Sequence, residues 1–278
     1  MKYVFTIILI AAIAWLAFSF SRDSANNELV LKYDELISDF EEMLNSTGTE
    51  AIIEEDPILS EEEDVKVPEE TASTLAEEKK EITVLPGQVL LDVDFTSQAP
   101  LRDWSYPWQD ACEEAAVLIT MRYFDGRGIA DKYEARDALQ EIIDWENETL
   151  GFYKDTSATT TVKIITDFYD YSNVRLEYEP TLEFMKKEIA KGNLIIMPAA
   201  GRLLENPYFT PPGPIYHNIV LIGYDDDSQI FYANDPGIMS GGGFKYSYNN
   251  IIESIADWSY EKASIDMSER VVIVVGPN

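Results

Sequence analysis

The sequence predicts an α+β fold in which N-terminal helices pack on a mainly antiparallel sheet. Segments with apolar residues at helical spacing come first in the folded part, and nearly unbroken apolar runs typical of strands cluster after them. Strands and helices do not alternate as they do in βαβ folds. With 278 residues, of which 46% are apolar, the chain is long enough to bury a sizeable core.

The chain begins with an apolar segment. Residues 3–21 contain no charged residue and lie between Lys2 and Arg22, so residues 1–21 are predicted to be a transmembrane signal anchor. The alternative is a signal peptide cleaved near Ala17-Phe18-Ser19. The positive charge at Lys2 places the rest of the chain outside the cytoplasm, held at the cell membrane by the N-terminal helix or secreted after cleavage.

The next segment, residues 22–81, is strongly acidic. It contains 20 acidic and 5 basic residues, a composition typical of a solvated and self-repelling linker. Apolar residues between Leu29 and Leu44 recur at helical spacing, so one short amphipathic helix is expected inside this acidic stalk. The folded domain is predicted to span residues 82–278.

Apolar patterning and turn residues divide the folded domain into regular elements. Helices are predicted near residues 111–124, 130–147, 158–171, 180–191 and 248–257. Strands are predicted near residues 82–95, 174–178, 193–198, 217–224, 229–234 and 270–276.

Charge and residue counts exclude several classes of function. The net charge of −30 repels nucleic-acid phosphates, so no nucleic-acid partner is expected. With one cysteine and one histidine, the chain lacks the residues for an internal disulfide or for a zinc or iron–sulfur site with cysteine ligands. The three acids Asp225 to Asp227 are more typical of a solvated turn than of a calcium site. We therefore expect no metal and no cofactor.

Cys112 is placed by its neighbours in the first turn of a helix. Apolar residues follow it at helical spacing in WQDACEEAAVLITMRYF. The helix N-terminus favours a thiolate and lowers the pKa of such a thiol, whereas Glu113 and Glu114 oppose that shift if they point toward the sulfur. The alternative is that Cys112 is a small buried core residue.

His217 opens the apolar run HNIVLIGYDDD, which is typical of a buried strand, and QIFYANDPG follows as its antiparallel partner. A hairpin centred on residues 225–228 pairs Tyr224 with Gln229 and brings His217 opposite Pro236. Asp235 then lies one residue away, within reach of the imidazole. A carboxylate in that position fixes the tautomer of the ring.

Cys112, His217 and Asp235 together form a nucleophile, a base and an orienting group in the papain-like order, with the cysteine on a helix and the other two on a sheet. The segments VDFTSQAPLRDWSYPWQDACEEAAVLI, GRLLENPYFTPPGPIYHNIVLIGYD and YANDPG resemble the bacterial cysteine peptidases of family 39-like type, relatives of the bacteriocin-processing double-glycine peptidase domain. The resemblance covers roughly residues 85–278. It implies a papain-like cysteine peptidase fold.

The resemblance also implies roles for single residues. Cys112 would be the nucleophile, His217 the general base and then acid, and Asp235 the orienting group, acting on a peptide or protein substrate through a thioester. Gln98 in FTSQ matches the glutamine that helps to form the oxyanion hole with the backbone N–H of Cys112. Gln109 is a rival for that role, because it lies nearer to Cys112 in the chain.

The loop before His217 is expected to contribute to substrate binding. It carries Asn206, Tyr208 and Phe209, and the alternative is a rigid turn that packs on the domain surface. Two other functions remain open from the sequence. One is a cell-wall amidase or endopeptidase with the same Cys–His pair, and the other is a catalytically silent surface module that binds peptides.

Overall fold

The computed structural model describes residues 85–278, which lie in the second of the two units of the chain, Glu78–Asn278. The predicted anchor at residues 1–21, the whole predicted stalk at residues 22–81 with its amphipathic helix, and residues 82–84 of the predicted folded domain lie outside the described residues.

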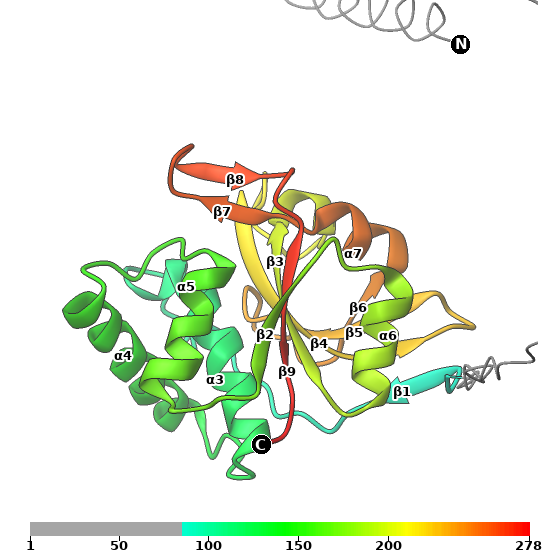
Figure 1. Ribbon diagram of the computed structural model, residues 1–278. Helices are drawn as coiled ribbons and strands as arrows, with labels where there is room; N and C mark the ends of the chain where they lie inside the picture. Colours follow the sequence, from blue (N-terminus) through cyan, green and yellow to red (C-terminus); the bar gives the residue numbers. More distant parts are fainter. Residues whose placement is uncertain (1–84) are drawn as a thin grey trace, which may run out of the picture. The chain divides into compact units, whose positions relative to one another are not determined.

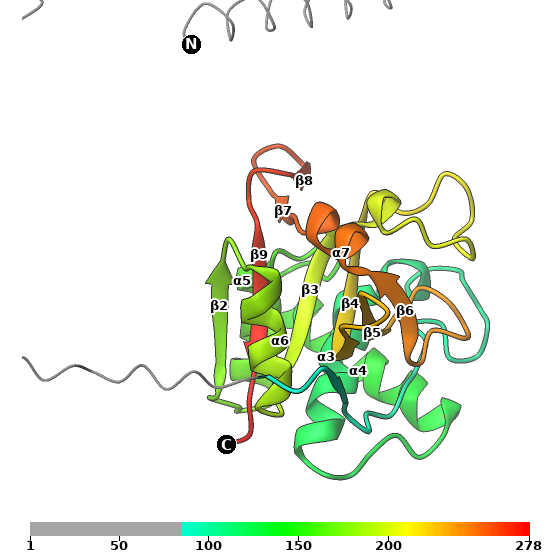
Figure 2. The same ribbon diagram turned by 90° about the vertical axis from the view of Figure 1, so that its right-hand side faces the viewer.

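An antiparallel sheet forms the centre of the described part (Figure 1). Figure 2 shows its strands side by side, and every pairing between them is antiparallel. The order across the sheet is β2 (Val174–Tyr178), β9 (Val271–Val275), β3 (Leu194–Ala200), β4 (Tyr216–Asp225), β5 (Ile230–Asn234) and β6 (Phe244–Ser247). A short strand, β1 (Gln88–Leu90), pairs with the last residues of β4, and β7 (Asp257–Ser259) and β8 (Ser264–Asp266) form a separate ribbon.

Helices cover both faces of the sheet (Figure 1). One face carries α3 (Cys112–Phe124), α4 (Lys132–Thr149) and α5 (Ala158–Lys163), which continues into a π-helical turn at Ile164–Phe168. The other face carries α6 (Leu182–Ala190) and α7 (Tyr248–Ser254). Two 3₁₀ turns, η1 (Trp108–Asp110) and η3 (Gly201–Leu204), complete the regular structure.

The unbroken apolar strands of the sequence are explained by these two layers. In β3, Leu194 and Ile196 pack against the α3 side, whereas Ile195 and Met197 pack against the α6 side. Successive strand residues point to opposite faces, so a strand covered on both faces needs apolar residues at every position. The prediction of N-terminal helices on a mainly antiparallel sheet is confirmed, and the second helical layer is an addition to it.

Most predicted elements are present, with three differences. The strand predicted at 82–95 is wrong beyond Leu90, where the carbonyls of Val93 and Asp94 accept from the side chain of Asn234 instead of pairing in a ladder. The helix predicted at 248–257 ends at Ser254, since residues from Asp257 pair in β7. Strands β6, β7 and β8 were not predicted; each has only three or four residues, too few for a periodic signal.

The hairpin between β4 and β5 has a different register from the predicted one. Tyr224 pairs with Phe231, not with Gln229, and Val220 pairs with Asn234. The shift between these two pairs marks a bulge, which places one extra residue in β4. His217 lies beyond this ladder and pairs with Ala199 of β3 rather than opposite Pro236.

Candidate active site

Cys112 is the first residue of α3, as the sequence predicts. The helix packs on the face of the sheet that includes Val220 and Ile222 of β4, and its first turn shares one cleft with the beginning of that strand. Ala111, directly before the helix, has no side-chain oxygen to cap it. The N–H groups of the first turn therefore donate no hydrogen bond to a capping side chain. The Cys112 side chain is buried, at 7% exposure, and still lines the cleft.

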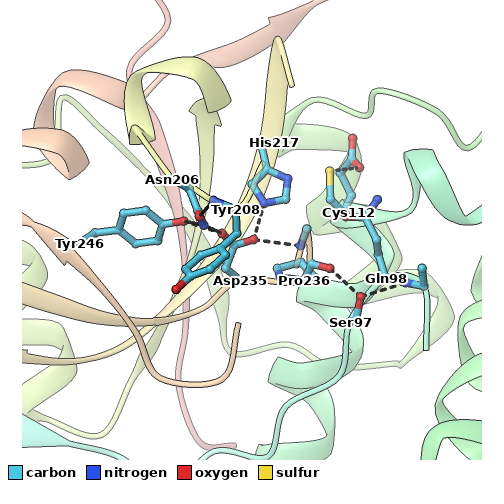
Figure 3. Close-up of polar contacts among 12 residues, drawn as sticks. Ser97, Gln98, Cys112, Asn206, Tyr208, His217, Asp235, Pro236 and Tyr246 are labelled. Atoms are coloured by element: carbon cyan, nitrogen blue, oxygen red, sulfur yellow. Dashed lines mark hydrogen bonds and ion pairs between the residues drawn. The ribbon is translucent and has the colours of Figure 1, made fainter. Parts of the chain in front are cut away.

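His217 and Asp235 form a buried pair. Nε2 of His217 lies 2.7 Å from Oδ1 of Asp235, which directly follows β5. The two residues are 2% and 0% exposed. Because Nε2 faces the carboxylate, Nδ1 is the ring nitrogen left to accept a proton. Figure 3 shows the imidazole with Asp235 below it and Cys112 beside it.

Gly237 fits tightly against this pair. A Cβ at this position would lie 2.7 Å from Cε1 of His217 and 3.1 Å from Oδ1 of Asp235, closer than side chains pack. Its backbone N–H also donates to Oδ1 at 2.9 Å. Because glycine has no side chain, the backbone of Gly237 can donate to Asp235 without displacing the His217 ring.

The second oxygen of Asp235 is held by two side chains that lie far apart in the sequence. Nδ2 of Asn206 donates to Oδ2 at 2.9 Å, and the hydroxyl of Tyr246 in β6 donates to the same atom (Figure 3). Asn206 also donates to the Tyr246 oxygen at 2.7 Å. Burial raises the pKa of Asp235, but the charge of His217 and the hydrogen bonds from His217, Tyr246 and Gly237 outweigh it, so the pKa lies below its ordinary value.

The sequence does not predict a role for Tyr246, and it predicts a role for Asn206 that differs from its observed contact with Asp235. Asn206 was predicted to bind substrate, but it is buried against Asp235 and does not line the main cleft. No signal in the sequence joins Tyr246 to the site, since the short strand β6 has no clear pattern. The contact exists only because β6 pairs with β5, which directly precedes Asp235, and Tyr246 lies opposite Phe231 in that pairing.

The two candidate glutamines lie in different surroundings. Gln98 is buried, at 4% exposure, and lines the cleft, with its Nε2 donating to the carbonyls of Trp108 and Gln109 at 3.0 and 2.9 Å. Its Oε1 has no hydrogen-bond partner among residues 85–278. The Gln109 side chain donates instead to its neighbour Asp110 at 3.1 Å, near the surface. Gln98 is thus tied to the turn that directly precedes Cys112.

The cleft around these residues has a volume of about 870 Å³. Cys112, His217 and Gln98 lie along it, together with Tyr208 and Phe209, as the sequence predicts for that loop. The Phe209 ring packs edge-on against the His217 ring, with centroids 5.3 Å apart. Tyr208 is 67% exposed at the edge of the cleft. The arrangement places a thiol, an oriented imidazole and aromatic surface around one space that a peptide can enter.

A comparison with family models decides the classification. The model described as "Peptidase_C39 like family" matches residues 90–265, more than half of the chain. The chain belongs to this family. It is therefore a cysteine-type peptidase, a hydrolase that acts on peptide or protein substrates, as the resemblance in the sequence implies.

Solved structures that are similar to this C39-like peptidase bear related descriptions. One is a protein from Bacillus anthracis described as a C39-like peptidase, with 14% identity, a TM-score of 0.45, and coverage of 69% of this chain and 98% of the other. Another is Xylellain, a cysteine protease from Xylella fastidiosa, with 14% identity, a TM-score of 0.37, and coverage of 72% and 90%. None of the curated proteins matches the chain.

The state of the nucleophile in this C39-like peptidase differs from the prediction. The Cys112 thiol bonds Oε2 of Glu113 at 3.0 Å. Burial raises the pKa of Cys112 well above its ordinary value, and the charge and hydrogen bond of Glu113 raise it further. Of the two opposing effects expected from the sequence, the one from Glu113 and Glu114 therefore prevails over the helix N-terminus, because the sulfur is buried beside a carboxyl group.

Two features are absent from the described residues. Within residues 85–278, no group of three or more His, Cys, Asp or Glu side chains is placed to hold a metal ion. No helix in the same residues combines the length and apolar character needed to cross a membrane. The predicted N-terminal anchor lies outside these residues.

Proposed function

We propose that the chain is a membrane-anchored, extracytoplasmic cysteine peptidase that cleaves peptide bonds through Cys112, His217 and Asp235. The observation that carries this proposal is the buried His217–Asp235 pair, 2.7 Å from Nε2 to Oδ1, in the same cleft as a cysteine at a helix N-terminus. A buried imidazole with one nitrogen held by a carboxylate is oriented for proton transfer at the other.

The first chemical step is a proton transfer. The Cys112 thiol gives its proton to Nδ1 of His217, and the imidazolium that forms is stabilised by Asp235. The thiolate then attacks the carbonyl carbon of the scissile peptide bond, forming a carbon–sulfur bond and a tetrahedral oxyanion. The three donors that hold Asp235, from Asn206, Tyr246 and Gly237, keep its carboxylate ionised for this purpose.

Collapse of the tetrahedral intermediate completes the acylation. The backbone N–H of Cys112 is proposed to stabilise the oxyanion. The amide of Gln98 lines the same cleft and is proposed to add a second donor once its Nε2 releases the carbonyls of Trp108 and Gln109. His217 gives its proton to the leaving amine, and the acyl group remains on Cys112 as a thioester. A water molecule deprotonated by His217 then attacks the thioester, which releases the acid and returns the proton to sulfur.

The aromatic edge of the cleft is proposed to bind the substrate chain. Tyr208, Trp104 and Ile215 line the cleft and are 67%, 40% and 51% exposed. Exposed apolar side chains around a cleft are typical of a surface that a partner covers. The Lys2-flanked apolar segment at residues 3–21 supports the location of this cleft outside the cytoplasm.

The test is cleavage of a mixture of unfolded proteins by the full chain, with the new termini identified by mass spectrometry. We expect cleavage by the native chain and a loss of at least about a thousandfold in Cys112→Ala and in His217→Ala, as for other paired nucleophiles and bases. Cleavage that survives either substitution would contradict the assigned roles. Release of cell-wall peptides alone would favour the amidase, and binding without cleavage would favour the silent module.

A further inference from the structure

Glu113 carries a buried carboxyl group that takes part in no step of the proposed reaction. It is 1% exposed, and each of its oxygens has a separate partner. Oε2 bonds Sγ of Cys112 at 3.0 Å, and Oε1 accepts the backbone N–H of Thr156 at 2.9 Å. The carboxyl group is thus fixed between the segment before α5 and the nucleophile itself.

The surroundings of Glu113 are mostly acidic. Within residues 85–278, no Lys, Arg or His side chain forms an ion pair with it. Burial raises the pKa of Glu113 well above its ordinary value, and the charge of Glu114 raises it further. The titratable groups that act on Cys112 and Glu113 or line the cleft beside them are Glu114, Asp110, Lys154, Asp155, Tyr216 and His217.

The hydrogen bond to Glu113 has a direct consequence for the thiol. Among the described residues, the Cys112 side chain has this one side-chain hydrogen bond, and none joins it to His217. A thiol has a single proton to donate, so it cannot donate to Oε2 of Glu113 and to Nδ1 of His217 at the same time. The two groups therefore compete for the same S–H.

We propose that Glu113 is a positioning residue that holds Cys112 in a resting state, with the proton kept on sulfur until the thiol turns from Oε2 of Glu113 to His217. The inference rests on the proposed function, because it assigns His217 as the acceptor in the active state. No atom is gained or lost in this step. The S–H···O bond to Glu113 breaks, an S–H···N bond to His217 forms, and the proton then passes to Nδ1.

The substitution Glu113→Gln tests this role without changing the shape of the side chain. The amide oxygen can still accept from the N–H of Thr156, whereas the amide nitrogen presents a donor to the sulfur in place of the acceptor Oε2. A donor stabilises a thiolate. The measurement is the rate of alkylation by iodoacetamide as a function of pH in the full chain, where Cys112 is the single cysteine.

We expect the apparent pKa of alkylation to fall by at least one unit in Glu113→Gln, which is about tenfold faster reaction below that pKa. The matched control is Glu114→Gln. Glu114 is also a buried acid whose charge raises the pKa of Cys112, but it has no hydrogen bond to Cys112 or Thr156. Its shift should be clearly smaller. Equal shifts in the two variants, or none in Glu113→Gln, would overturn the inference.

Two further measurements separate this inference from the proposed function. His217→Ala should slow the alkylation of Glu113→Gln; no effect of that substitution would contradict the Cys–His pair and leave the Glu113 result intact. The infrared S–H band of the native chain should report a strong hydrogen bond that weakens in Glu113→Gln. An S–H band typical of a free thiol in the native chain would overturn the Glu113 role even if the variant fails to fold.

Discussion

Asp235 uses its two carboxylate oxygens for different purposes. Oδ1 faces Nε2 of His217, and Oδ2 accepts from Asn206 and Tyr246. A buried carboxylate with all of these donors is held in one orientation and stays ionised, which offsets the cost of its burial. The orientation of the imidazole therefore depends on residues that touch neither the sulfur nor the substrate.

The substitution Tyr246→Phe removes one donor to Oδ2 and leaves the ring in the core. We expect kcat to fall roughly tenfold, in line with the loss of about 1.5 kcal/mol for a hydrogen bond to a charged group, while KM changes little. The Tyr246 bond lowers the pKa of Asp235, so its loss raises that pKa. The acid limb of the pH–activity profile should move to higher pH.

A matched control for this prediction is Tyr248→Phe. The Tyr248 hydroxyl also donates to a carboxylate, Oδ1 of Asp226 at 2.8 Å, but it lies at the hairpin away from the cleft. This control should leave the acid limb in place. If both variants shift the profile equally, or if Tyr246→Phe changes KM alone, the positioning role of Tyr246 is wrong.

Single residues differ in how far the sequence could predict them. Cys112 and His217 could be predicted as a candidate pair because each is the only residue of its kind, and Asp235 followed from a hairpin. The contacts of Asn206 and Tyr246 with Asp235 could not be predicted. The two residues are 40 positions apart in the chain and are brought together only by folding. The direction of the Cys112 pKa shift depends first on the burial of the sulfur and then on where Glu113 points, and spacing alone determines neither.

At the scale of elements, helices α3 and α4 each bury an acid, and the two acids lie close enough to act on each other. Glu114 of α3 and Glu146 of α4 are both 0% exposed, and their carboxyl oxygens have no hydrogen-bond partner among the described residues. Burial raises the pKa of Glu146 to about 8 and that of Glu114 well above its ordinary value. The charge of Glu146 raises the pKa of Glu114 further, so the pair favours binding a proton.

The free energy of unfolding should therefore fall as pH rises from about 4.5 to about 8. In this range the folded chain keeps a proton on Glu146 that the unfolded chain releases, so rising pH favours unfolding. A total loss on the order of a few kcal/mol is expected. In Glu146→Gln the slope should be flatter, because this group no longer titrates.

Thermal or urea unfolding of the full chain at pH 5 and at pH 8 measures this effect. Glu141→Gln is the matched control, because Glu141 lies on the same helix α4 and is exposed. The control should keep the native slope. A native chain whose stability rises between these two pH values, or a Glu146→Gln variant with an unchanged slope, would show that the buried pair does not bind the proton.

The β4–β5 hairpin shows why a correct contact can follow from an incorrect register. The predicted pairing of Tyr224 with Gln229 was two residues away from the observed partner, Phe231. The bulge in β4 before Gly223 removes part of this difference toward the end of the strand that carries His217. The predicted neighbour of His217, Asp235, was therefore right. A bulge leaves no mark in an apolar run, so the register could not be predicted from the sequence.

At the scale of the whole molecule, the two helical layers explain where the cleft lies. α3 brings Cys112 to one face of β4, whereas η3 and the loop that follows it bring Asn206 and Phe209 to the same end of that strand. The site is thus assembled where elements from both layers meet. The order of helices before strands was enough to predict the α+β class, but it contains no information on which face each helix covers.

The last prediction concerns the N-terminal segment and uses the full chain in cells. If residues 3–21 anchor the protein, it should sediment with membranes, resist extraction at alkaline pH and lose its folded domain to protease added outside the cell. Replacing Ile10 and Ile13 by Arg should release it, because each charge at the centre of a bilayer helix costs about 2.5 to 3.5 kcal/mol. The paired control replaces both residues by Leu. A soluble native chain that lacks its first residues would instead show a cleaved signal peptide.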